Sequence, residues 1–239
     1  DVANLILATL DDFLKPLPGA EEAVAEALAA TALPVIVAEV SDNAGGGAPG
    51  SGTHLLRAML AANEPKTCFS FVWDPDTVKQ AHAAGVGAKI KVKLGGFTDD
   101  LHGAPIEAEA YVKVLSDGQF ILLNPMGAGR QVNLGLMVRL VIGNVDVVVS
   151  SRREQTLDDC TLTLHGIDVR KMRVVGIKSQ QHFRGGFKHL AGTIIRTDTP
   201  GLTTSDLSVL PFKNIQRPIW PLDPLPAGYR EVISVGPAA

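Results

Sequence analysis

Apolar residues follow different patterns in different parts of the chain, and these patterns predict its elements. In residues 1–14 they recur every three or four positions, which predicts a helix with one apolar face because an α-helix turns once in about 3.6 residues. A Pro- and Gly-containing segment at 15–19 ends this pattern. A second, alanine-rich helix follows; it begins with Glu21 and Glu22 and ends before Pro34. We expect residues 1–30 to be a helical appendage, since the first helix has no obvious partner nearby.

Residues 34–87 alternate between strand and helix patterns. The run Val-Ile-Val-Ala-Glu-Val at 35–40 predicts a buried strand, and a helix begins at Thr53 after a glycine-rich loop. A strand at 67–73 precedes a short helix, with Asp74 as its N-cap. This β–α–β–α order favours a parallel or mixed sheet covered by helices.

The middle of the chain has the two-residue period of half-exposed strands. Residues 88–94 alternate between lysine and aliphatic side chains, which predicts a strand with one solvated face. Its three lysines could bind an anion, but a wet sheet face is the simpler interpretation. Further strands are expected at residues 106–115, 119–123, 136–142 and 145–150, joined by turns at 116–118 and 143–144. We therefore expect an antiparallel β insertion at about 88–145.

The last part of the chain returns to a mixed pattern. A helix at about 157–165, a strand at 173–177 and a helix reaching His182 are expected. The prolines from Pro200 onward indicate an extended tail that wraps the surface. The predicted fold class is α/β, with a mixed sheet flanked by helices, an antiparallel β insertion and a proline-rich C-terminal tail, in a domain that spans residues 31–239.

Composition and charge exclude several classes of protein. Hydrophobic residues make up 46% of the chain and charged residues 20%, so it can bury a full core. The formal net charge of −3 argues against a protein that coats nucleic acid or an anionic membrane. No apolar run approaches the roughly 20 residues that span a bilayer. Two cysteines are too few for a disulfide scaffold and no signal peptide is visible, so we expect a cytoplasmic protein.

The glycine-rich loop, residues 41–52, is the first candidate for chemistry. It follows an apolar strand and precedes a helix, where ligands usually bind in open α/β sheets. Residues 47–52 have the glycine spacing of a phosphate loop, but Thr53 and His54 follow in place of Lys-Ser or Lys-Thr, so ATP or GTP hydrolysis is not expected. Asp42 is the catalytic candidate, as a base, a group that orients water or a metal contact, and these alternatives stay open.

The residues beside Asp42 are candidates for substrate binding, because glycine lets a backbone approach a ligand closely. A merely flexible loop is the alternative interpretation. The candidates are Asn43, Gly45, Gly46 and Gly47.

A second polar cluster follows the predicted strand at 173–177. Lys178, Ser179, His182 and Arg184 supply a cation, a hydroxyl, an imidazole and a guanidinium within seven residues. Such a set could bind a carboxylate or stabilise an oxyanion, with His182 as a catalytic candidate and the others as substrate-binding candidates. If a helix starts at Ser179, its hydroxyl caps that helix, and the cluster could then be only a capped helix with surface charges.

Two arginines, Arg152 and Arg153, follow the predicted strand at 145–150. Arg152 is a substrate-binding candidate because the pair could clamp an anion, although both could instead pair with Asp158 and Asp159. The six histidines include no His-Glu-x-x-His and no His-x-His pair, and the two cysteines are isolated. We therefore assign no metal ligands in this chain.

Six motifs occur in a fixed order between residues 34 and 225. They are Ser41-Asp42-Asn43-x-Gly-Gly-Gly-Ala-Pro-Gly, Trp73-Asp74-Pro75, His82-Ala83-Ala84-Gly85-Val86-Gly87, Asp146-Val147-Val148-Val149-x-Ser151-Arg152-Arg153-x-Gln155, Lys178-Ser179-x-x-His182-Phe183-Arg184 and Arg217-Pro218-Ile219-Trp220-Pro221-Leu222-Asp223. No single motif is specific, but together and in this order they resemble the C-terminal domain of microcystinase C-like (MlrC-type) proteins.

The resemblance implies a zinc-dependent, peptidase-like hydrolase that acts on peptide bonds. Its implied partners are a metal-binding N-terminal domain of the same protein, which would precede a helical lead similar to residues 1–30, and a peptide or small-molecule substrate. Zinc would be held mainly by that N-terminal domain. The C-terminal domain would cover the metal cleft, with Asp42 facing it and Arg152 and residues 182–184 nearby. We expect this chain to be nearly inactive alone, and a homo-oligomer stays open.

The chain departs from the family pattern at two positions in the glycine-rich loop. Ala44 stands where proline is usual, and Ser51 stands where aspartate is usual, which removes a carboxylate that could contact metal or substrate. The alternative to a hydrolase domain is a non-enzymatic module that uses loop 41–52 to bind a small anion or ligand, or to form oligomers.

Overall fold

The computed structural model describes residues 2–225, which form two compact units. One unit is Pro18–Thr204, and the other combines residues 2–17 with residues 205–225. Residues 1 and 226–239, and with them Pro226 of the predicted tail, lie outside the described part of the chain. The domain boundary expected at residues 30 and 31 refers to a longer protein and stays a prediction.

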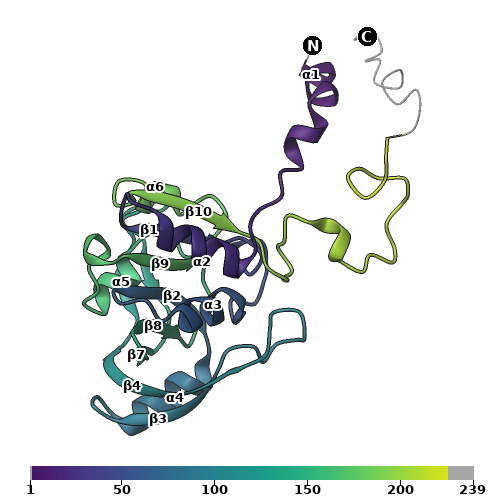
Figure 1. Ribbon diagram of the computed structural model, residues 1–239. Coiled ribbons are helices and arrows are strands. Elements are labelled where there is room, and N and C mark those ends of the chain that lie inside the picture. The colour runs from purple at the N-terminus through teal and green to yellow at the C-terminus, as the bar shows by residue number, and fades with distance from the viewer. Residues whose placement is uncertain (1, 226–239) are drawn as a thin grey trace. The chain divides into compact units, whose positions relative to one another are not determined.

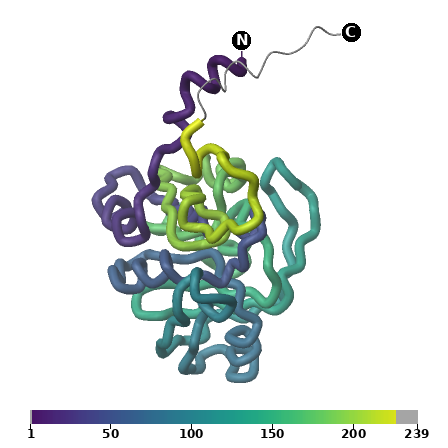
Figure 2. Tube along the Cα trace, turned by 90° about the vertical axis from the view of Figure 1, so that its right-hand side faces the viewer, coloured from purple at the N-terminus to yellow at the C-terminus, as the bar shows by residue number. Residues whose placement is uncertain are grey.

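The larger unit is built on an eight-stranded sheet with the strand order β10-β1-β9-β2-β8-β7-β4-β3 (Figure 1). The strands are β1 (Val35–Glu39), β2 (Thr67–Trp73), β3 (Lys89–Leu94), β4 (Ile106–Ser116), β7 (Met137–Ile142), β8 (Val145–Ser150), β9 (Val174–Lys178) and β10 (Thr193–Thr197). From β10 to β8 all neighbours are parallel, and from β8 to β3 all neighbours are antiparallel. The two edges, β10 and β3, lie at opposite ends of the unit in the ribbon view and in the tube view (Figures 1 and 2).

Helices cover both faces of this sheet because its central strands are apolar on both sides. In β1, Val35 and Val37 join one core cluster, while Ile36 and Ala38 join the other. The first cluster is covered by α2 (Ala20–Ala29), α3 (His54–Ala62) and α4 (Pro75–Ala84). The second is covered by α5 (Cys160–Leu164), α6 (Arg184–Phe187) and a two-stranded sheet of β5 (Gln119–Ile121) and β6 (Gln131–Asn133). Short 3₁₀ turns complete the chain: η1 (Leu10–Phe13), η2 (Ala44–Gly46), η3 (Val169–Lys171) and η4 (Leu207–Val209).

The structure confirms the predicted fold class, with a mixed sheet, flanking helices and an antiparallel extension. The strand expected at 67–73 is β2. Asp74 caps α4 as expected, since its Oδ1 accepts a hydrogen bond from the Thr77 amide at 2.9 Å. A local period or cap was therefore sufficient to predict these elements.

Other elements differ from the sequence-based expectation. The turn at 116–118 does not pair β4 with the next strand; β5 pairs with β6 in a separate sheet, because that sheet buries Leu122 and Val132 against the second core cluster. The strands β6 and β10 were not expected at all. The helix expected to reach His182 begins only at Arg184, so Ser179 does not cap it.

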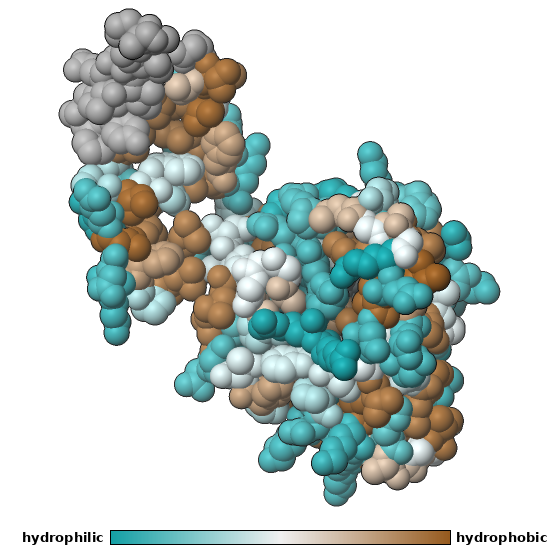
Figure 3. All heavy atoms as spheres, turned by 180° about the vertical axis from the view of Figure 1, so that it is seen from behind, coloured by the Kyte–Doolittle hydropathy of each residue, from teal (hydrophilic) through white to brown (hydrophobic). Residues whose placement is uncertain are grey.

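The smaller unit, as far as it is described, contains α1 (Val2–Ala8), η1 and η4. The apolar residues Val2, Leu5 and Ile6 of α1 are exposed in the described part of the chain. No helix among residues 2–225 is long and apolar enough to cross a membrane. Figure 3 shows one face of the molecule, on which hydrophobic residues reach the surface between hydrophilic ones.

Candidate functional site

The carboxyl ends of five parallel strands meet at one edge of the sheet. Polar residues follow each of them: Asp42 after β1, Asp74 after β2, Arg152 after β8, Lys178 at the end of β9 and Thr199 after β10. In open α/β sheets this edge is where ligands bind. The sheet topology thus places the strand ends that carry or precede Asp42, Arg152 and Lys178 at the same edge.

A buried ammonium group organises this edge. Lys178 Nζ lies 2.6 Å from Glu39 Oε2 and 2.8 Å from Asp42 Oδ2, and it donates a hydrogen bond to the Gly52 carbonyl at 2.9 Å. The same Nζ lies 5.5 Å from the ring centroid of Phe69. Burial lowers the pKa of Lys178, but the charges and hydrogen bonds of Asp42 and Glu39 outweigh burial and raise that pKa above its ordinary value. Lys178 therefore stays charged and neutralises one of its two carboxylate partners.

Asp42 ties the glycine-rich loop to this ammonium group. Its Oδ1 accepts the Gly50 amide at 2.7 Å and its Oδ2 accepts the Gly52 amide at 2.6 Å. The side chain is 1% exposed, and a Cβ on Gly52 would lie 2.6 Å from Oδ2. Both oxygens thus have partners within the protein. The catalytic role expected for Asp42 stays a prediction, and the geometry supports a role in holding the loop in place.

Glu39 extends the network to the segment that follows β10. Its Oε1 accepts a hydrogen bond from the Thr199 hydroxyl at 2.9 Å, and the Thr199 amide donates to Ser41 Oγ at 2.9 Å. Thr203 makes the next connection, because its Oγ1 accepts the Asn43 amide at 3.0 Å and donates to the Val40 carbonyl at 2.8 Å. The segment 199–204 is therefore fastened to the start of the glycine-rich loop.

His102 is a member of the site that sequence reasoning missed. This side chain is fully buried, with Nδ1 at 2.8 and 2.9 Å from the two oxygens of Asp99 and Nε2 at 3.6 Å from Asp42 Oδ1. The Leu202 amide donates to Nε2 at 3.2 Å. Only the Asp-x-x-His spacing marks His102 in the sequence, and that spacing does not reveal contacts with Asp42 or Leu202.

Most amide groups of the glycine-rich loop are used within the protein. Asn43 Oδ1 accepts the Gly45 amide at 3.1 Å, and the Asn43 carbonyl accepts the amides of Gly46 and Ala48. The Gly47 amide donates to Ala44. An anion-binding loop needs free N–H groups, so this arrangement gives little support to the anion-binding alternative. Gly45, Gly46 and Gly47 nevertheless present exposed backbone at the sheet edge.

Gln155 joins the exposed part of the loop to the second polar cluster. Its Nε2 donates to Ser179 Oγ at 3.2 Å, and its Oε1 lies 3.4 Å from His182 Nδ1. A Cβ on Gly45 would lie 2.3 Å from Gln155 Oε1, so the Gln155 side chain packs directly against the loop. Ser179 is buried and His182 is exposed. The structure thus brings Gly45, Ser179 and His182 together around a residue that sequence reasoning did not select.

The arginines lie apart from one another. Arg152 Nη1 contacts the Asn133 carbonyl of β6 at 3.5 Å, whereas Arg153 Nη1 contacts Ala48 of the loop at the same distance. Arg184 donates from Nε to Gln181 Oε1 at 3.0 Å and lies over the ring of Phe183. Neither Arg152 nor Arg153 makes a described ion pair with Asp158 or Asp159. The role expected for Arg152 stays a prediction, and Arg153 is the arginine that touches the loop.

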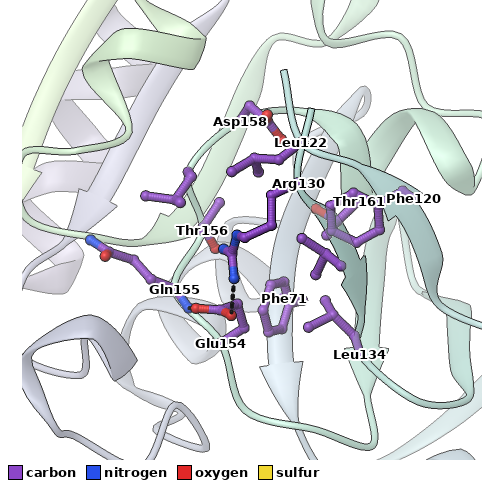
Figure 4. A pocket seen from close by; sticks show the side chains of 12 residues that line it. Phe71, Phe120, Leu122, Arg130, Leu134, Glu154, Gln155, Thr156, Asp158 and Thr161 are labelled. Atoms are coloured by element: carbon purple, nitrogen blue, oxygen red, sulfur yellow. Dashed lines mark hydrogen bonds and ion pairs between the residues drawn. The ribbon is translucent and has the colours of Figure 1, made fainter. Parts of the chain in front are cut away.

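Two hollows in the described part of the chain are lined by other residues than the predicted site residues. One, of about 10 Å³, has room for about one water molecule and lies beside the Arg130–Glu154 ion pair of 3.6 Å (Figure 4). Its walls include Phe71 and Leu134. The other, of about 650 Å³, is lined by Leu33 and residues 64–66 and 170–173, at the amino ends of the strands.

The described residues do not offer a zinc site. Among residues 2–225, no group of three or more His, Cys, Asp or Glu side chains is placed to hold a metal ion. The buried carboxylates Glu39 and Asp42 bind the Lys178 ammonium, and a metal cation cannot share that position because like charges repel. The donor set at this edge therefore does not fit a metal.

Comparison with known proteins identifies relatives of this chain. The family whose model is described as MlrC C-terminus matches residues 37–214. Microcystinase C of Sphingomonas sp is 30% identical over 199 residues, which are 83% of this chain and 38% of that protein. The crystal structure of a "Putative metallopeptidase" from Mesorhizobium sp. BNC1 superposes with a TM-score of 0.83 at 25% identity, covering 95% of this chain and 45% of that one. The chain thus spans less than half the length of each of these two relatives.

Substitution of Lys178 by Met should strongly destabilise the larger unit. The variant leaves Glu39 and Asp42 buried without their cation, which costs about 3–5 kcal/mol in proteins of this kind. Urea denaturation followed by circular dichroism measures the free energy of unfolding. Lys188→Met is the matched control, since Lys188 is exposed and its replacement should change that free energy by less than about 0.5 kcal/mol. Equal stability of the two variants would contradict the central role of Lys178.

Proposed function

This chain belongs to the MlrC C-terminus family, and from that premise we propose that it is the C-terminal domain of a metallopeptidase-like hydrolase. Its carboxyl-end edge would line the substrate cleft of a longer protein. The names of its relatives, a microcystinase and a metallopeptidase, support action on peptide bonds. The share of those relatives that the chain covers supports a further domain in the full protein.

The observation that carries the proposal is that the carboxyl-end edge of the sheet has a buried, hydrogen-bonded layer and an exposed surface above it. Lys178, Glu39 and Asp42 are buried and paired with one another. Above them the backbone of Gly45–Gly47 is exposed, with His182 beside it. Preorganised polar groups on a rigid support are what a substrate-binding edge requires, because their orientation costs no free energy at the moment of binding.

The exposed groups suit a peptide substrate. The imidazole of His182 can donate a hydrogen bond to a carbonyl or carboxylate oxygen, and Arg184 and Arg153 can pair with a carboxylate. Glycine at positions 45–47 allows a peptide backbone to approach the loop without side-chain obstruction. The roles of Asn43, Ser179 and Arg152 in substrate binding belong to the same proposal.

A metal ion, when bound in the longer protein, would supply an activated water molecule and polarise the scissile carbonyl. The described part of this chain does not fit such an ion, so we place the metal ligands outside it, and zinc is the metal expected from the family resemblance. The chain's own residues would orient the peptide and stabilise negative charge on its oxygen atoms. A cytoplasmic location and a homo-oligomer stay predictions from the sequence.

Replacement of His182 by Gln in the full-length protein should lower kcat/KM for hydrolysis of short linear peptides by at least about tenfold, because an imidazole at the edge is lost. His182 is exposed, so thermal stability should not change. His189→Gln is the control, since it removes another exposed imidazole from the same region. Unchanged turnover in the His182→Gln protein would contradict the proposal that His182 lies in the substrate cleft.

The isolated chain should neither bind zinc tightly nor hydrolyse peptides when zinc is added. Isothermal titration calorimetry with zinc chloride measures binding, and the same peptide assay measures turnover. We expect no stoichiometric binding at micromolar concentrations, because Glu39 and Asp42 are held by Lys178. A stoichiometric, tight zinc complex together with peptide cleavage by this chain alone would overturn the proposal that another part of the longer protein holds the metal.

A further inference from the structure

His102 is the one imidazole among residues 2–225 that is completely buried, and it lies where three separate segments meet. It belongs to the loop between β3 and β4, as does its partner Asp99. Its other neighbours are Asp42, which follows β1, and Leu202, which follows β10. One side chain thus connects the loop 95–105, the glycine-rich loop and the segment 199–204.

The hydrogen bonds define the protonation state of this imidazole. A backbone amide can only donate, so the 3.2 Å contact from the Leu202 N–H makes Nε2 an acceptor. Nδ1 then carries the proton and donates to the Asp99 carboxylate at 2.8 and 2.9 Å. These two contacts are those of a neutral imidazole with its proton on Nδ1.

Leu202 is followed by a residue that positions the glycine-rich loop. Thr203 Oγ1 accepts the Asn43 amide, and Asn43 Oδ1 in turn accepts the Gly45 amide. A Cβ on Gly46 would lie 2.5 Å from Thr203 Cγ2, so Thr203 is also packed against the loop. Displacement of Leu202 would therefore be transmitted through Thr203 to the exposed backbone at Gly45 and Gly46.

We infer that His102 is a positioning residue that acts as a pH-dependent latch on the segment 199–204. In its neutral form Nε2 holds the Leu202 amide and keeps Thr203 against the glycine-rich loop. Protonation turns Nε2 into a donor, which cannot accept from Leu202 and instead faces Asp42 Oδ1, now 3.6 Å away. The segment 199–204 then loses one of its anchors and loosens.

Charged and titratable groups from several elements surround His102. Asp99 lies on the same loop, Asp42 follows β1, Lys178 lies beyond Asp42 on β9, and His54 of α3 packs near Gly103. Burial raises the pKa of Asp99, but hydrogen bonds from the His102 side chain and backbone, the charge that His102 carries when protonated, and the hydrogen bond from the Leu101 amide outweigh burial and lower it below its ordinary value.

A lowered carboxyl pKa stabilises the fold above the unfolded-state pKa, and this contribution is lost only as the pH falls through the folded-state value. Asp99 therefore keeps its charge in the mildly acidic range where histidines usually titrate. Loosening of the segment 199–204 in that range would therefore not arise from protonation of Asp99. The latch would operate in this chain whether or not the longer protein is a hydrolase.

The test is an NMR titration of the ¹⁵N-labelled chain from about pH 8 to about pH 5. The ring signals of His102 report its protonation, and hydrogen exchange at the Leu202 amide, corrected for the intrinsic pH dependence of exchange, reports the latch. We expect protection of Leu202 to fall about tenfold as His102 is protonated, the effect of losing one ordinary hydrogen bond. Unchanged protection across the His102 titration, or a His102 that does not titrate in the folded chain, would overturn the inference.

Two substitutions separate the latch from a structural effect. His102→Gln offers an amide oxygen that accepts from Leu202 at every pH, so protection should no longer depend on pH. The matched control, His189→Gln, removes an exposed imidazole and should keep the wild-type pH dependence. A His102→Gln chain in which protection of Leu202 depends on pH as in the wild type would contradict the latch. If this variant does not fold, the titrations of the wild type and of His189→Gln still test whether protection of Leu202 follows protonation of His102.

Discussion

The buried contact between Lys178 and the carboxylates of Glu39 and Asp42 is the interaction on which the carboxyl edge depends. The parallel pairing of β1 with β9 places Glu39 directly opposite Lys178, so the fold itself brings the charges together. Asp42 then connects this pair to the amides of Gly50 and Gly52. A buried carboxylate is tolerated only when it is paired and hydrogen-bonded, so the sheet register and the loop conformation stabilise each other.

This arrangement explains how a loop with so many glycines can be ordered. Glycine has a high conformational entropy in the unfolded chain, and ordering it is costly. Here Asp42 and Asn43 accept hydrogen bonds from the loop, and Thr203 and His102 fasten it from outside. The exposed backbone of Gly45–Gly47 is then presented in one conformation beside His182, which is the property that the proposed role in peptide binding requires.

The sequence predicted those features that depend on neighbouring residues. The strand β2 and the cap at Asp74 have local signals, and the mixed sheet follows from the order of elements. His102 was missed because its contacts with Asp42 and Leu202 connect residues 60 to 100 positions apart, which no local pattern encodes. Alternation could not distinguish Arg152 from Arg153 because both follow the end of β8, where the strand period stops. Ser179 accepts from Gln155 instead of capping a helix, a choice that only the tertiary structure decides.

The replacement of Asp42 by Asn tests the central claim most directly, because the amide keeps the size of the side chain but loses its charge and one acceptor. Hydrogen exchange at the Gly50 and Gly52 amides would be measured in the isolated chain, without substrate. Our account predicts that exchange at Gly52 accelerates by at least about tenfold, since its acceptor is weakened or lost. Unchanged protection at both amides, together with loss of turnover in the full-length Asp42→Asn protein, would contradict it and assign Asp42 directly to catalysis.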